Sequence, residues 1–170
     1  MRKSFFLFIL SLLSITMQAQ TTMITPPYLQ KGDTVAILAT ARKHIVKSMQ
    51  PTIDLLESWG LNVVIGKSIG LEENQLAGSD EQRAADLQEQ LDNPNIKAIW
   101  CARGGYGTVR VVDLIDFIQF KKSPKWLVGF SDVTVLHSHL NTMGYKSIHG
   151  IMPISLAKAS KEAIESLRLS

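Results

Sequence analysis

Cysteine is nearly absent from this chain of 170 residues. Its one cysteine, Cys101, excludes an internal disulfide, which is no objection to export because many exported proteins have none. Ile99 and Trp100 precede it in an apolar run. We therefore expect Cys101 to be a small buried hydrophobe in a strand and not a reactive thiol.

Clusters of a single charge are also missing. The 18 Lys and Arg residues nearly balance the 15 Asp and Glu residues, and no basic block with interleaved aromatic residues is present. A nucleic-acid partner is therefore not expected. The four histidines have no spacing typical of a metal site, and we expect neither a metal nor another cofactor.

Internal repeats and low-complexity linkers are lacking too, while 45% of the residues are hydrophobic and 19% are charged. This is an ordinary globular balance, and the length allows one domain with a sizeable core. The apolar-rich run Phe5 to Leu13 is shorter than the roughly 20 residues that a membrane-spanning helix needs.

The amino terminus has the pattern of a secretory signal peptide. Arg2 and Lys3 precede the run Phe5 to Leu13, and Ala19 offers a small residue for cleavage. We expect residues 1–20 to be removed and the protein to be exported to the periplasm, without stable membrane association. An uncleaved anchor is the alternative. No cysteine lies near the cleavage site, so a lipid-modified terminus is not supported.

Three further segments follow the signal. Residues 21–33 contain Pro26 and Pro27, which exclude a central strand and favour an extended arm on the surface. Residues 34–155 carry the globular pattern of an α/β domain. Residues 156–170 resemble the start of a linker or helix that leads to a further domain.

Short apolar runs alternate with amphipathic stretches over residues 34–155. Strands are expected at Val35–Ala39, Val63–Ile65, Ile96–Ala102, Trp126–Gly129 and Ser147–His149. Helical patterns lie between them, from Pro51 to Gly60, from a capping box of Ser79 and Gln82 to Leu91, at Val109–Phe120, at Val133–Met143 and at Lys161–Leu169. With no hairpin signals, this alternation predicts an α/β fold with a mostly parallel sheet and helices on both faces.

One serine lies on a predicted strand-to-helix turn. Residues 129–132 read Gly-Phe-Ser-Asp, so the hydroxyl of Ser131 would project from the carboxyl edge of the sheet, as a nucleophile does. The first free amides of the next helix would stabilise an oxyanion. Val133 stands where the hydrolase elbow has its second glycine. The alternative role of Ser131 is to cap the helix.

A glycine loop, Arg103-Gly104-Gly105-Tyr106-Gly107, follows another predicted strand, where open parallel sheets place their ligand sites. Its amides are suited to a phosphate or to half of an oxyanion hole. No Lys-Ser or Lys-Thr pair follows, so it is not a Walker loop. The plain alternative is a tight turn, with Tyr106 packed on it and Arg103 paired to a carboxylate such as Asp113.

The histidines offer no catalytic set with Ser131. His137 and His139 lie too far along the following helix to point back at its start, so we expect structural roles for both. His149 ends a strand beside the predicted site and is expected to line it. His44 is expected in a mobile loop.

Taken together, residues 103–107, then Leu127-Val128-Gly129-Phe130-Ser131-Asp132-Val133-Thr134, then His149-Gly150 resemble the LD-carboxypeptidase family of serine peptidases. The lead Pro26-Pro27-Tyr28-Leu29-Gln30-Lys31-Gly32-Asp33 also resembles the start of that family. The similarity covers roughly residues 25–155.

The resemblance implies an amino-terminal domain like that of class I glutamine amidotransferases, with a flavodoxin-like sheet. It also implies a Ser-Glu-His triad with Ser131 as nucleophile, and the amides of Asp132 and Gly105 as the oxyanion hole. Substrate binding is then expected from Arg103, Gly104, Tyr106 and His149. Family members remove a terminal D-amino acid, typically D-alanine, from peptidoglycan tetrapeptide through an acyl-enzyme, and they often form homodimers.

In that family the triad glutamate and histidine come from a second domain, which we do not find before Ser170. We therefore expect the 170-residue chain to be truncated, and inactive and poorly soluble by itself. One alternative is a non-catalytic domain that binds muropeptide. A weaker one is a nucleotide phosphate site in the glycine loop.

Overall fold

A computed structural model describes residues 22–170 of the chain. The signal peptide expected at residues 1–20 lies outside the described residues. Within residues 22–170 no helix is both long and apolar enough to cross a membrane. Residues 22–33 run along the protein in an extended form, where the Ile24 amide donates to the Gly144 carbonyl at 2.7 Å and the Trp126 indole donates to the Pro27 carbonyl at 3.0 Å.

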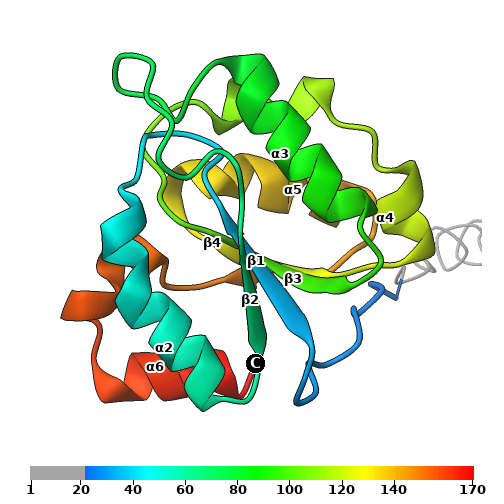
Figure 1. The fold of residues 1–170 in the computed structure, drawn as a ribbon. Helices are drawn as coiled ribbons and strands as arrows, with labels where there is room; N and C mark the ends of the chain where they lie inside the picture. The colour runs from blue at the N-terminus through cyan, green and yellow to red at the C-terminus, as the bar shows by residue number, and fades with distance from the viewer. Residues whose placement is uncertain (1–21) are drawn as a thin grey trace, which may run out of the picture.

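A parallel sheet of five strands forms the centre of the molecule (Figure 1). The strands are β1 (Thr34–Leu38), β2 (Asn62–Ile65), β3 (Ile96–Cys101), β4 (Trp126–Gly129) and β5 (Ile148–His149). Their order is β2-β1-β3-β4-β5, and each neighbouring pair is parallel. This order is that of flavodoxin-like sheets, so the predicted fold class is confirmed.

Helices cover both faces of the sheet, as Figure 1 shows. The α-helices are α2 (Gln50–Ser58), α3 (Asp80–Asp92), α4 (Ile118–Lys122), α5 (Thr134–Thr142) and α6 (Lys161–Arg168). Short 3₁₀ turns occupy Val46–Met49, Thr108–Arg110, Val112–Leu114, Ser131–Val133 and Pro153–Lys158. The capping box of α3 forms as predicted, with the Gln82 amide donating to Ser79 Oγ and the Ser79 amide donating to Gln82 Oε1.

The three central strands, β1, β3 and β4, contribute alternate side chains to two separate cores. Leu38, Ile99 and Leu127 pack with α3, α4 and α5 on one face. Ile37 and Trp100 pack with α2 on the other face, against which α6 also lies. Cys101 is buried in the first core, and burial raises the pKa of its thiol to about 12. The prediction of a small buried cysteine in a strand is confirmed.

The prediction of one continuous helical stretch at Val109–Phe120 is wrong. Ile115 is extended and separates the two 3₁₀ turns from α4. Asp116 competes with the helix, because its backbone amide and carbonyl both bond to the Gln88 side chain and its carboxylate accepts the Ile118 amide at 2.7 Å.

Lys125 connects the end of α3 to the entry of β4. The residue is 2% exposed, and its Nζ donates to the carbonyl oxygens of Gln90 and Asn93 at 3.0 and 2.7 Å. We expect Lys125→Met to lower the free energy of unfolding by about 1–3 kcal/mol, because one buried and one part-buried carbonyl oxygen lose their donor.

Guanidinium denaturation measures this loss. The control is Lys121→Met, which removes an exposed lysine of α4 and should change stability by less than about 0.5 kcal/mol. Equal losses in the two variants would contradict the proposed role of Lys125.

Candidate active site

The turn after β4 is tight and strained. Gly129 has no room for a side chain, since a Cβ there would lie 2.8 Å from Val133 Cγ1. Phe130 is extended, and Ser131 then takes a φ of +61°, a left-handed conformation that is unusual for a residue other than glycine. Such strain persists only where the surrounding structure enforces it, and it concentrates at functional sites.

The hydroxyl of Ser131 does not cap a helix. Phe130 holds the capping position of the 3₁₀ turn, Val133 that of α5, and neither end has a capping side chain. Ser131 is exposed, and its hydroxyl has no hydrogen-bond partner within residues 22–170. The capping alternative is therefore wrong, and the serine presents a free hydroxyl on a strained elbow.

The glycine loop lies directly against this elbow. A Cβ on Gly104 would lie 3.4 Å from the Asp132 amide nitrogen and 3.4 Å from Ser131 Cβ. Gly105 has a φ of +119° and faces the Arg42 side chain instead. The structure thus places Gly104 beside Ser131 and Asp132, with Gly105 next in the chain.

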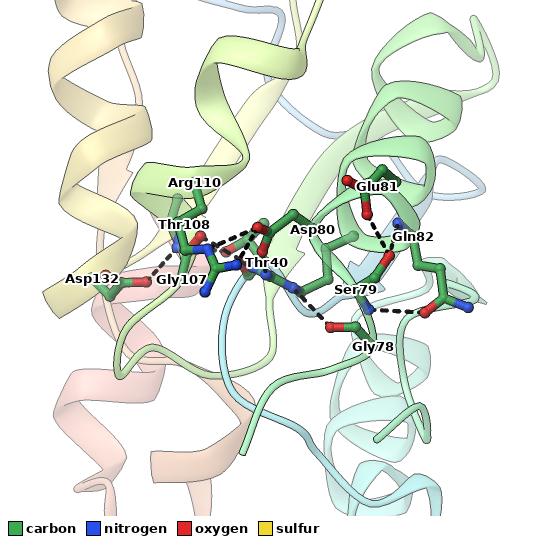
Figure 2. Close-up of polar contacts among 11 residues, drawn as sticks. Thr40, Gly78, Ser79, Asp80, Glu81, Gln82, Gly107, Thr108, Arg110 and Asp132 are labelled. Atoms are coloured by element: carbon green, nitrogen blue, oxygen red, sulfur yellow. Dashed lines mark hydrogen bonds and ion pairs between the residues drawn. The ribbon is translucent and has the colours of Figure 1, made fainter. Parts of the chain in front are cut away.

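Asp132 holds the loop and the elbow together. Its carboxylate Oδ2 accepts the Thr108 amide at 2.9 Å, directly after the last glycine of the loop (Figure 2). Its own amide lies in the first turn of the 3₁₀ segment, where no acceptor exists within the helix. The carboxylate of Asp132 is therefore structural, while its amide is available to an oxyanion.

Arg103 and Tyr106 do not have the purely structural roles considered as alternatives, an ion pair with Asp113 and packing on the turn. Arg103 Nη1 donates to the Lys43 carbonyl at 3.4 Å and makes no ion pair with Asp113 in the described part of the chain. Its side chain lines a groove beside the glycine loop, together with residues of the 43–48 and 70–72 segments. Tyr106 is 51% exposed and is not covered by the turn.

His44 and His149 both lie at this edge of the sheet. His149 is exposed at the end of β5, and its ring centroid lies 6.2 Å from that of Phe130, the residue before Ser131. The side chain of His44, which we expect in a mobile loop, is 5% exposed and lies 3.3 Å from Ser48 Oγ. Burial, with Arg103 nearby, lowers the pKa of His44.

His137 and His139 are structural, as predicted. His137 Nε2 lies 2.9 Å from the Gly129 carbonyl, which fixes a donor there, and Nδ1 lies 2.7 Å from Ser147 Oγ. Burial lowers the pKa of His137. His139 stacks against Phe117 with ring centroids 4.7 Å apart. Neither histidine hydrogen-bonds to Ser131 in residues 22–170.

Arg83 is a central residue that the sequence pattern does not reveal. It lies on α3 with no exposed surface, and it donates to the carbonyls of Thr40 at 2.6 Å and Gly107 at 3.0 Å and to that of Gly78 at 3.4 Å. Asp80 pairs with it and with Arg110, and Figure 2 shows Asp80 and Arg110 close to Gly107 and Thr108. The capping box places Arg83 on α3, but only the fold shows what it contacts.

Residues 22–170 contain no group of three or more His, Cys, Asp and Glu side chains placed to hold a metal ion. A separate apolar cavity of about 150 Å³ lies between α2, α6 and the sheet. Its lining includes none of the residues at the elbow or in the glycine loop. The chemistry-bearing groups therefore gather at the carboxyl edge of β3, β4 and β5.

The comparison with family models agrees with this geometry. The model described as the LD-carboxypeptidase N-terminal domain matches residues 35–150. The chain belongs to the LD-carboxypeptidase family. The matched segment of this LD-carboxypeptidase domain contains both the glycine loop and the Ser131 elbow.

Curated relatives bear names from the same family. A probable murein peptide carboxypeptidase of Bacillus subtilis is 42% identical over 129 residues, which cover 75% of this chain and 40% of the relative. The murein tetrapeptide carboxypeptidase of Pseudomonas aeruginosa is 34% identical over 78% of this chain and 46% of its own length. The chain thus spans less than half the length of these relatives.

Solved structures share the fold. A microcin C7 self-immunity protein superimposes with a TM-score of 0.77 at 22% identity, over 86% of this chain and 45% of that one. A muramoyltetrapeptide carboxypeptidase from Oxalobacter formigenes gives a TM-score of 0.69 at 29% identity, over 79% of this chain and 46% of that one.

The buried cation of Arg83 supports a stability prediction. Arg83→Met leaves three loop carbonyls without a donor, and we expect the free energy of unfolding to fall by about 3–5 kcal/mol. Arg110→Met is the control, because Arg110 is exposed and shares Asp80, and its loss should cost less than about 1 kcal/mol. Urea denaturation of both variants tests this, and similar small losses would refute it.

The lowered pKa of His137 predicts a pH dependence. The folded protein binds a proton at His137 less readily than the unfolded chain, whose histidine pKa is near 6.5. The contribution of His137 to the free energy of unfolding is therefore fully present above this pH and decreases as the pH falls below it. Denaturation midpoints at about pH 7.5 and about pH 5.5 should differ less in His137→Gln than in the wild type. An unchanged pH dependence in the variant would show that His137 is not responsible.

Proposed function

We propose that this chain is the nucleophile-bearing domain of a serine carboxypeptidase that acts on peptidoglycan peptides. The observation that carries the proposal is the exposed hydroxyl of Ser131 on a strained elbow, in contact with the glycine loop. The names of the relatives, murein peptide and murein tetrapeptide carboxypeptidase, support the substrate class.

In the proposed reaction, Ser131 Oγ attacks the carbonyl carbon of the penultimate residue. A base accepts the hydroxyl proton, and the negative charge of the tetrahedral intermediate lies near the amides of Asp132 and Gly105. The C–N bond then breaks, the proton passes to the leaving amine of a terminal D-amino acid such as D-alanine, and an acyl-enzyme remains on Ser131. Water hydrolyses this ester by the reverse proton path.

The base of this mechanism would come from outside the described residues. His137 has both ring nitrogens engaged, and no histidine of residues 22–170 hydrogen-bonds to Ser131. A glutamate and a histidine from a second domain would complete the triad. Because the expected signal peptide directs export, the proposed place of action is the periplasm.

The same observation favours one second candidate, a muropeptide-binding domain without catalysis. A domain that holds the loop and the elbow but has no base would still bind the peptide. Turnover, measured separately from affinity, distinguishes the two candidates.

The test uses residues 22–170 joined to the part of the Bacillus subtilis relative that follows its matched segment. This chimera should release D-alanine from peptidoglycan tetrapeptide. Ser131→Ala and Ser131→Gly should each lower kcat by about 10³-fold or more, with peptide affinity within about threefold. The glycine variant preserves the positive φ of the elbow.

Ser138→Ala, which changes an exposed serine of α5, is the matched control and should leave kcat unchanged. Retained turnover in both Ser131 variants would exclude Ser131 as the nucleophile. A folded chimera that binds the tetrapeptide without releasing D-alanine would favour the binding-domain candidate.

A further inference from the structure

Arg42 lies at the carboxyl edge of the sheet, in the segment that follows β1, and its side chain runs along the glycine loop. A Cβ on Gly105 would lie 2.6 Å from Arg42 Cδ and 2.9 Å from Arg42 Nε. The absence of a side chain at Gly105 is therefore what allows the guanidinium stem to approach the loop.

The guanidinium of Arg42 has no acceptor within residues 22–170. Its Nε is buried without a hydrogen-bond partner, and it takes part in no ion pair of the described residues. Nearby cations differ in this respect, since Lys43 pairs with Glu72 and Arg110 pairs with Asp80. A buried donor without a partner is unfavourable, and an oxygen atom of a ligand would satisfy it.

The charge around Arg42 favours an anion. Arg103, from the start of the glycine loop, donates to a backbone carbonyl and has no carboxylate partner within residues 22–170. The carboxylate of Asp132 is occupied by the Thr108 amide. Two guanidinium groups without carboxylate partners thus lie near the elbow.

The spacing suits a carboxylate one residue away from Ser131. Gly104 lies close to Ser131, and Gly105, the next residue, lies close to Arg42. Adding these contact distances to the standard spacing of neighbouring residues puts Arg42 Cδ at most about 13 Å from Ser131 Cβ. The side chain extends beyond Cδ, and a terminal carboxylate lies about one residue, roughly 3.8 Å, from the carbonyl that the serine attacks. This upper limit is compatible with a substrate whose penultimate carbonyl lies at Ser131 and whose terminal carboxylate lies at Arg42.

We propose that Arg42 binds the terminal carboxylate of the substrate peptide. This assignment rests on the proposed peptidase function and adds the group that recognises the chain end. A guanidinium offers paired donors in a fixed fork, which matches a carboxylate better than a single ammonium does. An arginine that holds the terminal carboxylate would favour cleavage of the last residue of the peptide.

The test measures binding to the 170-residue chain by calorimetry. Two probes are compared, peptidoglycan tetrapeptide with a free terminal carboxylate and the same peptide with a terminal amide. The wild-type chain should bind the carboxylate form about 10-fold to 100-fold more tightly. Arg42→Gln should remove this preference while affinity for the amide changes less than about threefold, and Arg42→Lys should keep part of it.

Arg110→Gln is the matched control and should retain the full preference, since Arg110 is paired with Asp80. Circular dichroism establishes that each variant is folded. A wild-type chain that binds both peptides equally, or an Arg42→Gln variant that keeps the preference, would overturn the role of Arg42 and leave the proposed function intact. A folded wild-type chain that binds neither peptide would overturn the muropeptide proposal as well.

Discussion

The carboxyl edge of this sheet depends on one buried cation. Arg83 reaches from α3 to the carbonyl oxygens of Thr40, Gly78 and Gly107, which belong to three different loops. Parallel strands end with loops on the same edge, and those loops need donors for their buried carbonyls. The single guanidinium of Arg83 supplies the donors for all three carbonyls, while Asp80 balances its charge. The glycine loop is thereby fixed before any ligand binds.

The strained elbow relies on this fixed loop. Ser131 holds a positive φ because Gly129 allows the tight turn beneath it and Gly104 fits against its backbone. The bond from the Thr108 amide to Asp132 then locks the loop to the elbow. A hydroxyl, free helix amides and a glycine backbone are thus held in place together, which is the preorganisation that stabilisation of an oxyanion requires.

Much of the fold follows from local sequence patterns. The five strands, the capping box of α3 and the elbow at Ser131 all lie where apolar periodicity and turn residues predict them. The helical prediction at Val109–Phe120 failed because Asp116 bonds to Gln88, a residue far away in the sequence. Gln88 is an ordinary polar residue on a helix surface, so the local sequence does not predict this contact.

The sequence by itself determined the strand and helix order, the strand-to-helix turn and the glycine loop, because hydrophobic periodicity and backbone preference act over a few neighbouring residues. Only the tertiary structure decided that Arg83 is buried, that Gly104 lies beside Ser131, and that His44 is covered. Long polar side chains such as Arg83 and Arg42 take their roles from groups many residues away. Their partners are therefore set by how the strands bring the loops together, and not by the residues beside them in the chain.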